Sequence, residues 1–246
     1  MAGVLVVTGA GRGIGAAIAE LGGARGWKVC VNYSRAKDKA KAVARKIRDG
    51  GGSAIAVQAD VGKEADIVRL FQEVDKAFGP VTALVNNAGI DLPARDTAEV
   101  ELEGLQKIFA VNVFGPFLCA REAIRRMSTR RGGKGGVIVN ISSRASGHYK
   151  LVGEMPYTAS KGALDAFTMG LANEVAPDGV RVACIRPGLI MTEIFDDKDK
   201  LIERAKTAVP LGRVGDPMEI ATAAIWLCSS EASYVTGMIM DVGGGR

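Results

Sequence analysis

Two side chains that can exchange a proton lie four residues apart in this 246-residue sequence. Tyr157 and Lys161 begin a segment whose apolar spacing predicts a helix over Tyr157–Glu174, so both side chains lie on one helix face. A free tyrosine has a pKa of about 10, and a neighbouring cation lowers that pKa by stabilising the phenolate. The pair therefore predicts general acid–base chemistry, in which Tyr157 exchanges a proton with an oxygen atom of a substrate.

Three other polar side chains could complete a site around this pair. Ser142 and Ser143 follow a predicted strand, Gly136–Ile141, and either hydroxyl could hold a substrate oxygen beside the phenol. Asn112 interrupts a long apolar window, Leu102–Thr129, that predicts a helix. A buried amide in such a window is either a satisfied core residue or part of a site.

A glycine-rich segment directly after the first predicted strand has the pattern of a phosphate-binding loop. Thr8 and the next seven residues fit T-G-x-x-x-G-x-G, and the segment opens a helix predicted over Gly13–Arg25. Small residues let the backbone approach a pyrophosphate, and a helix N-terminus supplies unpaired N–H groups and positive potential. We therefore expect a dinucleotide here, contacted by Gly9, Gly11, Arg12, Gly13, Ile14 and Gly15.

The end of the second predicted strand indicates which dinucleotide binds. NAD-specific sites place a carboxylate there against the ribose 2′-hydroxyl, whereas NADP-specific sites bind the 2′-phosphate with cations. Here the segment holds Asn32, Ser34 and Arg35, and the first acidic residue after the strand is Asp38. Arg12 and Arg35 together suit a phosphate, although each could equally be a solvated surface charge. The sequence favours NADP as the cofactor, with NAD as the alternative.

Two further segments extend the expected cofactor site. Asp60 and Val61 follow the third predicted strand, where a carboxylate can accept a hydrogen bond from the adenine amino group. Asn87, Ala88 and Gly89 follow the fourth strand, within an Asn-Asn-Ala-Gly run. Each segment would be an ordinary loop signal in isolation. Their place after successive strands puts them at the edge where a dinucleotide is expected.

The elements that must position these residues alternate between short β-branched runs and longer segments of helical period. That alternation predicts an α/β fold: a Rossmann-type, doubly wound, seven-stranded parallel sheet flanked by helices, in one domain over residues 1–246. The predicted strands are Val4–Val7, Lys28–Asn32, Ala54–Gln58, Ala83–Val85, Gly136–Ile141, Val180–Ile185 and Met238–Asp241. The predicted helices are Gly13–Arg25, Ala36–Asp49, Lys63–Phe78, Leu102–Thr129, Tyr157–Glu174 and Pro217–Leu227.

Composition narrows the class of protein. Apolar residues make up 48% of the chain, and the net charge of +5 is scattered, which disfavours nucleic acid as a partner. The sequence contains neither a signal-peptide pattern nor an apolar run of membrane-spanning length, so we expect a cytoplasmic protein that binds no membrane. The widely spaced Cys30, Cys119, Cys184 and Cys228 predict neither a disulfide framework nor a metal site.

Taken in order, the motifs resemble those of the short-chain dehydrogenase/reductase family over essentially the whole chain. They are T-G-x-x-x-G-x-G, N-N-A-G, N-x-S-S, Y-x-x-x-K and Arg186-Pro187-Gly188. The resemblance extends to 3-oxoacyl-acyl-carrier-protein reductases and glucose dehydrogenase-like members. It implies a single NAD(P)-binding Rossmann-type domain that usually forms a homotetramer.

The resemblance also implies a role for each site residue. Tyr157 would be the acid/base, and Ser143, the second serine of its pair, would orient the substrate oxygen. Lys161 would lower the pKa of the phenol and bind the nicotinamide ribose, while Asn112 would hold a water molecule in a proton relay. The nicotinamide end of the site would be lined by Pro187, Gly188, Ile190 and Thr192.

The expected activity is NADP-dependent interconversion of a carbonyl and a secondary alcohol, with a ketone or 3-oxoacyl substrate. A sugar or polyol dehydrogenase is the alternative, and a sensor that binds NADP(H) without turnover is a third hypothesis. Substrate contacts are expected from Arg144–Pro156, which holds His148, and from Met191–Val209, a candidate helical lid. An acyl carrier protein could dock on a basic cluster, although these side chains could equally be a solvated helix end: Arg125, Arg126, Arg130, Arg131 and Lys134.

Overall fold

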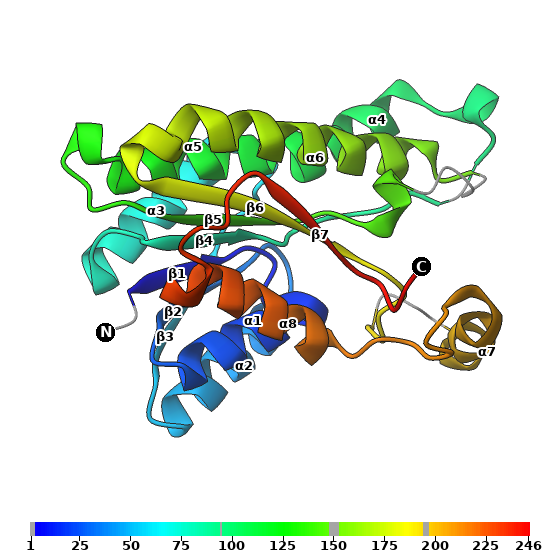
Figure 1. Ribbon diagram of the computed structural model, residues 1–246, viewed down its shortest axis with the longest axis horizontal. Helices are drawn as coiled ribbons and strands as arrows, with labels where there is room; N and C mark the ends of the chain where they lie inside the picture. The colour runs from blue at the N-terminus through cyan, green and yellow to red at the C-terminus, as the bar shows by residue number, and fades with distance from the viewer. Residues whose placement is uncertain (1–2, 94, 148–152, 194–196) are drawn as a thin grey trace.

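A computed structural model describes residues 3–93, 95–147, 153–193 and 197–246. Seven parallel strands form one sheet in the order β3-β2-β1-β4-β5-β6-β7 (Figure 1). The strands are β1 (Val4–Val7), β2 (Lys28–Tyr33), β3 (Ser53–Gln58), β4 (Ala83–Asn86), β5 (Gly136–Ile141), β6 (Val180–Pro187) and β7 (Met238–Val242). The predicted doubly wound parallel sheet is confirmed, with strand ends that differ from the predicted ones by one or two residues.

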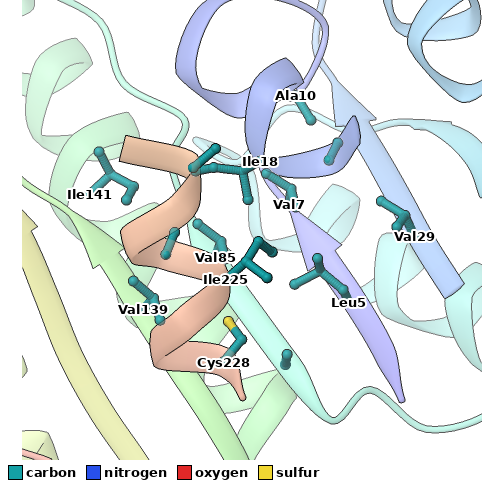
Figure 2. Close-up of a cluster of buried hydrophobic side chains, with 14 of the residues drawn as sticks. Leu5, Val7, Ala10, Ile18, Val29, Val85, Val139, Ile141, Ile225 and Cys228 are labelled. Carbon is teal, nitrogen blue, oxygen red and sulfur yellow. The ribbon is translucent and has the colours of Figure 1, made fainter. Parts of the chain in front are cut away.

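Helices cover both faces of the sheet, so the central strands are buried on both sides and consist of apolar, mostly β-branched residues. One face carries α1 (Gly13–Ala24), α2 (Lys37–Asp49) and α8 (Pro217–Cys228). The other carries α3 (Glu64–Phe78), α5 (Gly115–Met127) and α6 (Met155–Val175). Figure 2 shows the first of these layers, where Ile225 and Cys228 of α8 face Val85, Val139 and Leu5 of the sheet.

The order of the strands sets the position of the site. β1 lies between β2 and β4, so the chain leaves β1 toward one side of the sheet and later returns to build the other. In parallel sheets a ligand binds at such a switch point, beyond the carboxyl ends of the strands. The glycine loop follows β1, and the Asn-Asn-Ala-Gly run follows β4. Both motifs therefore lie at the switch point.

The helix predicted over Leu102–Thr129 is present from Leu102 to Met127, but it is not α-helical throughout. The chain forms α4 (Leu102–Phe109), one π-helical turn over Ala110–Phe114, and then α5. Pro116 has no N–H group to donate to the carbonyl one α-helical turn earlier, and the amide of Gly115 instead donates to the carbonyl of Ala110. Asn112 lies inside this wider turn.

Two other helices bear on the site. α6 begins at Met155, two residues earlier than predicted, because Pro156 suits a first helical turn. The candidate lid contains α7 (Lys198–Ala208), whose first turn is capped by Asp197. No helix in the described part of the chain combines the length and apolar character needed to cross a membrane.

Candidate active site

The side chains of Tyr157 and Ser143 meet at the carboxyl edge of the sheet, where α6 begins beside the end of β5. The hydroxyl of Ser143 is hydrogen-bonded to the phenol of Tyr157 and accepts a hydrogen bond of 3.1 Å from the amide of Ala145. Ser142 is buried and donates its hydroxyl to the main-chain oxygen of Lys161 at 3.2 Å. Of the two serines, Ser143 is therefore the one that faces the phenol.

The ammonium group of Lys161 is buried beside the ring of Tyr157. Its Nζ atom lies 5.7 Å from the ring centroid and donates to the main-chain oxygen of Ile141 at 2.9 Å. Burial lowers the pKa of Lys161 to about 8, against the opposing effects of Cys184, Asp165 and Asp91. At neutral pH the side chain is therefore still mostly protonated, although a modest rise in pH removes its charge.

Tyr157 differs from the sequence prediction in one respect. Burial raises the pKa of its phenol to about 12; the hydrogen bond from Ser143 opposes this rise, and the nearby carboxylates of Asp91 and Glu154 add to it. The expected lowering of this pKa does not occur, because desolvation and two carboxyl groups outweigh the hydrogen bond from Ser143, and Lys161 is not among the groups that shift the pKa. The phenol therefore carries its proton at neutral pH, which is the state that a general acid needs.

Asn112 joins three parts of the site through its side-chain amide. Its Oδ1 atom accepts from the amide of Ile90 at 2.9 Å, and its Nδ2 atom donates to the oxygen of Ile90 and to the hydroxyl of Ser160. A Cβ atom added to Gly89 would lie 3.5 Å from both Asn112 Oδ1 and Lys161 Nζ. The amide is thus satisfied by protein groups and ties the loop after β4 to α6, one residue before Lys161.

The glycine loop is shaped by close contact with the loop after β4. Gly9 has φ of 63°, and a Cβ atom there would lie 2.9 Å from Ala88 Cα. A Cβ atom on Gly15 would lie 2.4 Å from Asn87 Nδ2, which donates to the main-chain oxygens of Thr8 and Gly9. Larger residues are therefore excluded at both glycines, and the two loops hold one another in place.

The start of α1 suits a pyrophosphate. Arg12, the residue before the helix, is extended and gives no side-chain cap, and the first turn of the helix contains no acidic residue. Gly13, with φ of 55°, faces Thr192 across the loop, since an added Cβ atom would lie 3.4 Å from Thr192 Cγ2. Free N–H groups, positive helix potential and a glycine-lined approach together fit the phosphate groups of a dinucleotide.

The residues expected at the 2′-phosphate end divide into two groups. Arg12, Ser34 and Arg35 are exposed, and neither arginine forms an ion pair within the described residues. Asn32 is buried instead: its Oδ1 atom accepts from the amide of Gly9 at 3.2 Å, and its Nδ2 atom donates to the oxygens of Val57 and Ala59. Asn32 therefore holds the glycine loop through its hydrogen bond with Gly9, and the exposed Arg12 and Arg35 supply the positive charge that a ligand could reach.

The remaining cofactor positions line the same edge of the sheet. Asp60 accepts from the amide of Gly62 at 3.0 Å, while the side chain of Val61 is buried near Gly115. Gly188 packs against Gly243, where an added Cβ atom would lie 2.6 Å from Gly243 Cα. The last residue of β6, Pro187, and the segment after it approach the glycine loop, where Thr192 lies against Gly13. Among the four residues expected at the nicotinamide end, Pro187 and Ile190 are buried, whereas Gly188 and Thr192 are partly exposed.

Two acidic residues lie beside the phenol: Asp91, which sequence reasoning missed, and Glu154, which lies in the segment Arg144–Pro156 where substrate contacts were expected. Asp91 and Glu154 line a cavity of about 150 Å³, together with apolar residues that include Leu92, Val100 and Pro156. The pKa of each carboxyl group is raised by burial, and Asp91 raises that of Glu154 further. Isolated acidic residues in two separate loops give no pattern, although Asp91 directly follows the Asn-Asn-Ala-Gly-Ile run. His148 lies outside the described residues.

The basic cluster lies at the other edge of the sheet. Its residues lie in the last turn of α5 and in the segment that connects α5 to the amino end of β5, whereas Tyr157 lies at the carboxyl ends of the strands (Figure 1). Arg126 pairs with Asp75 and Glu122, Arg125 with Glu122, and Arg130 with Asp178. Among the described residues, no group of three or more His, Cys, Asp or Glu side chains could hold a metal ion.

Comparisons with known proteins agree with this geometry. A family model described as enoyl-(acyl carrier protein) reductase matches residues 9–246. An uncharacterized oxidoreductase, YgfF, from Escherichia coli is 42% identical over 99% of both chains, and glucose 1-dehydrogenase 2 from Bacillus subtilis is 40% identical over 98% of this chain and 93% of the other.

Solved structures match over almost the whole chain, at lower sequence identity. A short-chain dehydrogenase/reductase from Serratia marcescens has a TM-score of 0.92 at 33% identity, covering 99% of this chain and 97% of the other. A 3-ketoacyl-(acyl-carrier-protein) reductase from Brucella melitensis, complexed with NADH, has a TM-score of 0.90 at 36% identity over 99% and 98%. A metagenomic blue fluorescent protein in complex with NADPH has a TM-score of 0.90 at 32% identity over 99% and 97%.

Fold and site together define a dinucleotide-dependent oxidoreductase with a tyrosine–lysine pair at the carboxyl edge of a doubly wound sheet. The chain belongs to the short-chain dehydrogenase/reductase family and is an NAD(P)-dependent enzyme of that family.

The contact between the two cofactor loops gives a testable prediction. Gly15→Ala should weaken NADPH binding at least ten-fold, because the new methyl group would clash with Asn87 and with the main-chain oxygen of Gly9. Gly162→Ala is the matched control, since a Cβ atom there meets nothing within 4 Å. Titration calorimetry measures both, and equal affinity in the two variants would contradict this account of the loop.

Proposed function

We propose that the protein reduces a ketone to a secondary alcohol, with NADPH as the preferred cofactor and Tyr157 as the general acid. One observation carries the proposal: the phenol of Tyr157 is hydrogen-bonded to Ser143 and lies beside Lys161, at the carboxyl edge of the sheet, where the glycine loop also lies. A protein that only senses NADP(H) has no need of this group.

Bound NADPH supplies a hydride, and the chain's own residues supply the proton and the orientation. Tyr157 donates its proton to the substrate oxygen as negative charge develops there. Ser143 hydrogen-bonds to that oxygen and keeps it within reach of the phenol. Lys161, protonated at neutral pH, stabilises the resulting phenolate and binds the nicotinamide ribose, while Asn112 fixes the adjoining loop and helix.

The cofactor preference rests on exposed charge. Arg12 and Arg35 could each donate charge-assisted hydrogen bonds to a 2′-phosphate, which NAD lacks. No acidic residue lies between the start of β2 and Asp38, so no carboxylate stands at the end of β2 to select NAD. Ser34 is exposed, directly follows β2 and precedes Arg35, so it could contact the ribose or its phosphate. The pyrophosphate would lie against Gly9, Gly13, Ile14 and Gly15, and the adenine beside Asp60 and Val61.

The substrate class follows from where charge lies. Docking of an acyl carrier protein on the basic cluster is disfavoured, because that cluster is at the opposite edge of the sheet from Tyr157. A small ketone therefore fits the site better than a carrier-bound acyl group. A sugar or polyol is the second candidate, because Asp91 and Glu154 in the adjoining cavity could accept hydrogen bonds from hydroxyl groups.

We also infer a homotetramer in the cytoplasm, with no nucleic acid or membrane partner. Phe114 and Phe117 are 57% and 55% exposed, and Met169 of the neighbouring α6 is 44% exposed, so this helical layer carries uncovered apolar surface. The four cysteines are free and buried, which suits a reducing compartment. Light scattering at micromolar concentration tests the assembly, and a monomer would contradict it.

The catalytic proposal is tested by removing one oxygen atom. The wild-type enzyme is first screened for NADPH oxidation with diketones, acetoacetyl thioesters, aldoses and quinones. Tyr157→Phe should then lower kcat at least a thousand-fold on the best substrate and leave NADPH affinity nearly unchanged, because the ring remains. Lys161→Ala should impair both turnover and NADPH affinity. A Tyr157→Phe enzyme with most of the wild-type rate would refute the mechanism.

Cofactor selection is tested by changing charge alone. Each charge-assisted hydrogen bond contributes about 1.5–3 kcal/mol, so wild-type kcat/KM should favour NADPH over NADH by roughly ten-fold or more. The double change Arg12→Ala with Arg35→Ala should abolish this preference. The control, Arg131→Ala with Lys134→Ala, removes the same charge from exposed sites at the far edge and should preserve it. Equal preference in the two double variants would show that the arginines do not select the cofactor.

A further inference from the structure

A buried carboxylate lies one helical turn beyond the catalytic lysine. Asp165 follows Lys161 by four residues on α6, and its Oδ2 atom accepts two hydrogen bonds from Arg186, from Nε at 3.0 Å and from Nη2 at 2.7 Å. Its Oδ1 atom accepts a weak hydrogen bond from the thiol of Cys184 at 3.4 Å. The side chain of Asp165 is only 8% exposed, so this ion pair is largely shielded from water.

The ion pair continues across the carboxyl ends of the neighbouring strands. Arg186 on β6 stands opposite Asp241 on β7, with 3.9 Å between Arg186 Nη1 and Asp241 Oδ1. The other carboxylate oxygen of Asp241 binds the guanidinium of Arg144, which directly follows Ser143. The chain of charges Asp165–Arg186–Asp241–Arg144 thus connects the helix that carries Lys161 to the segment that carries Ser143.

The first member of this chain acts on the charge of Lys161. Four groups affect Lys161 electrostatically or line its pocket: Cys184 on β6, Asp165 and Tyr157 on α6, and Asp91 in the loop after β4. Tyr157 and Cys184 have pKa values raised to about 12, so both are neutral near pH 8. Asp165 and Asp91 are therefore the negative charges that offset the cost of burying the ammonium.

Asp165 would itself be costly to bury without a partner. An isolated carboxylate in a protein interior gains a proton rather than remain charged, and a hydrogen-bonded cation prevents this. Arg186 provides that cation through two hydrogen bonds to one oxygen atom. Arg186 therefore holds the carboxylate of Asp165 in place on α6, one helical turn from Lys161.

We propose that Asp165, paired with Arg186, is a positioning residue that maintains the ammonium form of Lys161 in its buried pocket. This inference deepens the proposed function and rests on it for the use that catalysis makes of Lys161. The role is distinct from a merely structural one, because it acts on the proton affinity of a particular nitrogen atom. The guanidinium of Arg186, in the Arg-Pro-Gly run, is held by two hydrogen bonds to this carboxylate.

The direct test is the titration of Lys161 in ligand-free protein. Lysine labelled with ¹³C at Cε gives a resonance for Lys161 that is identified by its loss in Lys161→Met. The wild-type midpoint should fall near pH 8, and Asp165→Asn should lower it by about one pH unit, since an adjacent opposite charge raises a lysine pKa by at least that much. Coincident midpoints would overturn the proposal.

Two further variants separate this role from loss of folding. Asp165→Asn combined with Arg186→Gln leaves no unpaired buried charge, and Arg186 is not among the groups that shift the pKa of Lys161, so the same lowering is expected. Asp178→Asn removes another buried carboxylate, bonded to Ser128 at the amino edge of the sheet, and should leave the Lys161 midpoint unchanged. A shift in the Asp178 variant equal to that of the Asp165 variants would also overturn the proposal.

Kinetics provide a second arm. In the reducing direction, the fall of kcat/KM at high pH should move to lower pH by the same interval in Asp165→Asn, because Lys161 loses its proton earlier. A wild-type enzyme without turnover on any carbonyl would defeat the proposed function, while the titration of Lys161 would still decide the role of Asp165. An unshifted kinetic profile alongside a shifted titration would contradict the use of Lys161 in catalysis.

Discussion

Burying the ammonium group of Lys161 is the constraint on which the rest of the site depends. A charge removed from water requires partners, and here the main-chain oxygen of Ile141 and the carboxylates of Asp165 and Asp91 provide them. These partners come from β5, from α6 and from the loop after β4. The ammonium therefore fixes how three elements meet, and the phenol of Tyr157 is placed against Ser143 by the same arrangement.

Buried polar side chains between the strand ends make this edge of the sheet rigid. Asn86 donates to Asn140 at 2.9 Å, and Asn140 donates to Thr168 of α6 at 2.9 Å, so β4, β5 and α6 are joined beneath the site. Thr8 accepts from the amides of Asn87 and Ala88 in the same way. Hydrogen bonds between buried polar side chains of this kind favour one arrangement of the loops, which a cofactor then meets already formed.

Sequence patterns predicted the sheet, its seven strands and the place of the motifs, because periodicity and glycine spacing are local properties. Within the helix predicted over Leu102–Thr129 they did not reveal the π-helical turn over Ala110–Phe114, because apolar periodicity does not distinguish an α-helical turn from a π-helical one. They also misjudged the pKa of Tyr157, since its rise depends on desolvation and on Asp91, which is distant in sequence. Pairings such as Asp165 with Arg186 require three-dimensional contacts, and no single-sequence pattern contains them.

The central claim is that this chain moves hydride to a carbonyl carbon while Tyr157 supplies the proton. The most direct measurement uses NADPH doubly deuterated at C4 with the best ketone in the screen, followed by mass spectrometry and NMR of the alcohol. We predict one deuterium on the carbon that bears the new hydroxyl group, transferred from C4 of the cofactor. An alcohol whose carbinol hydrogen comes from water, or NADPH consumption without any alcohol, would contradict it.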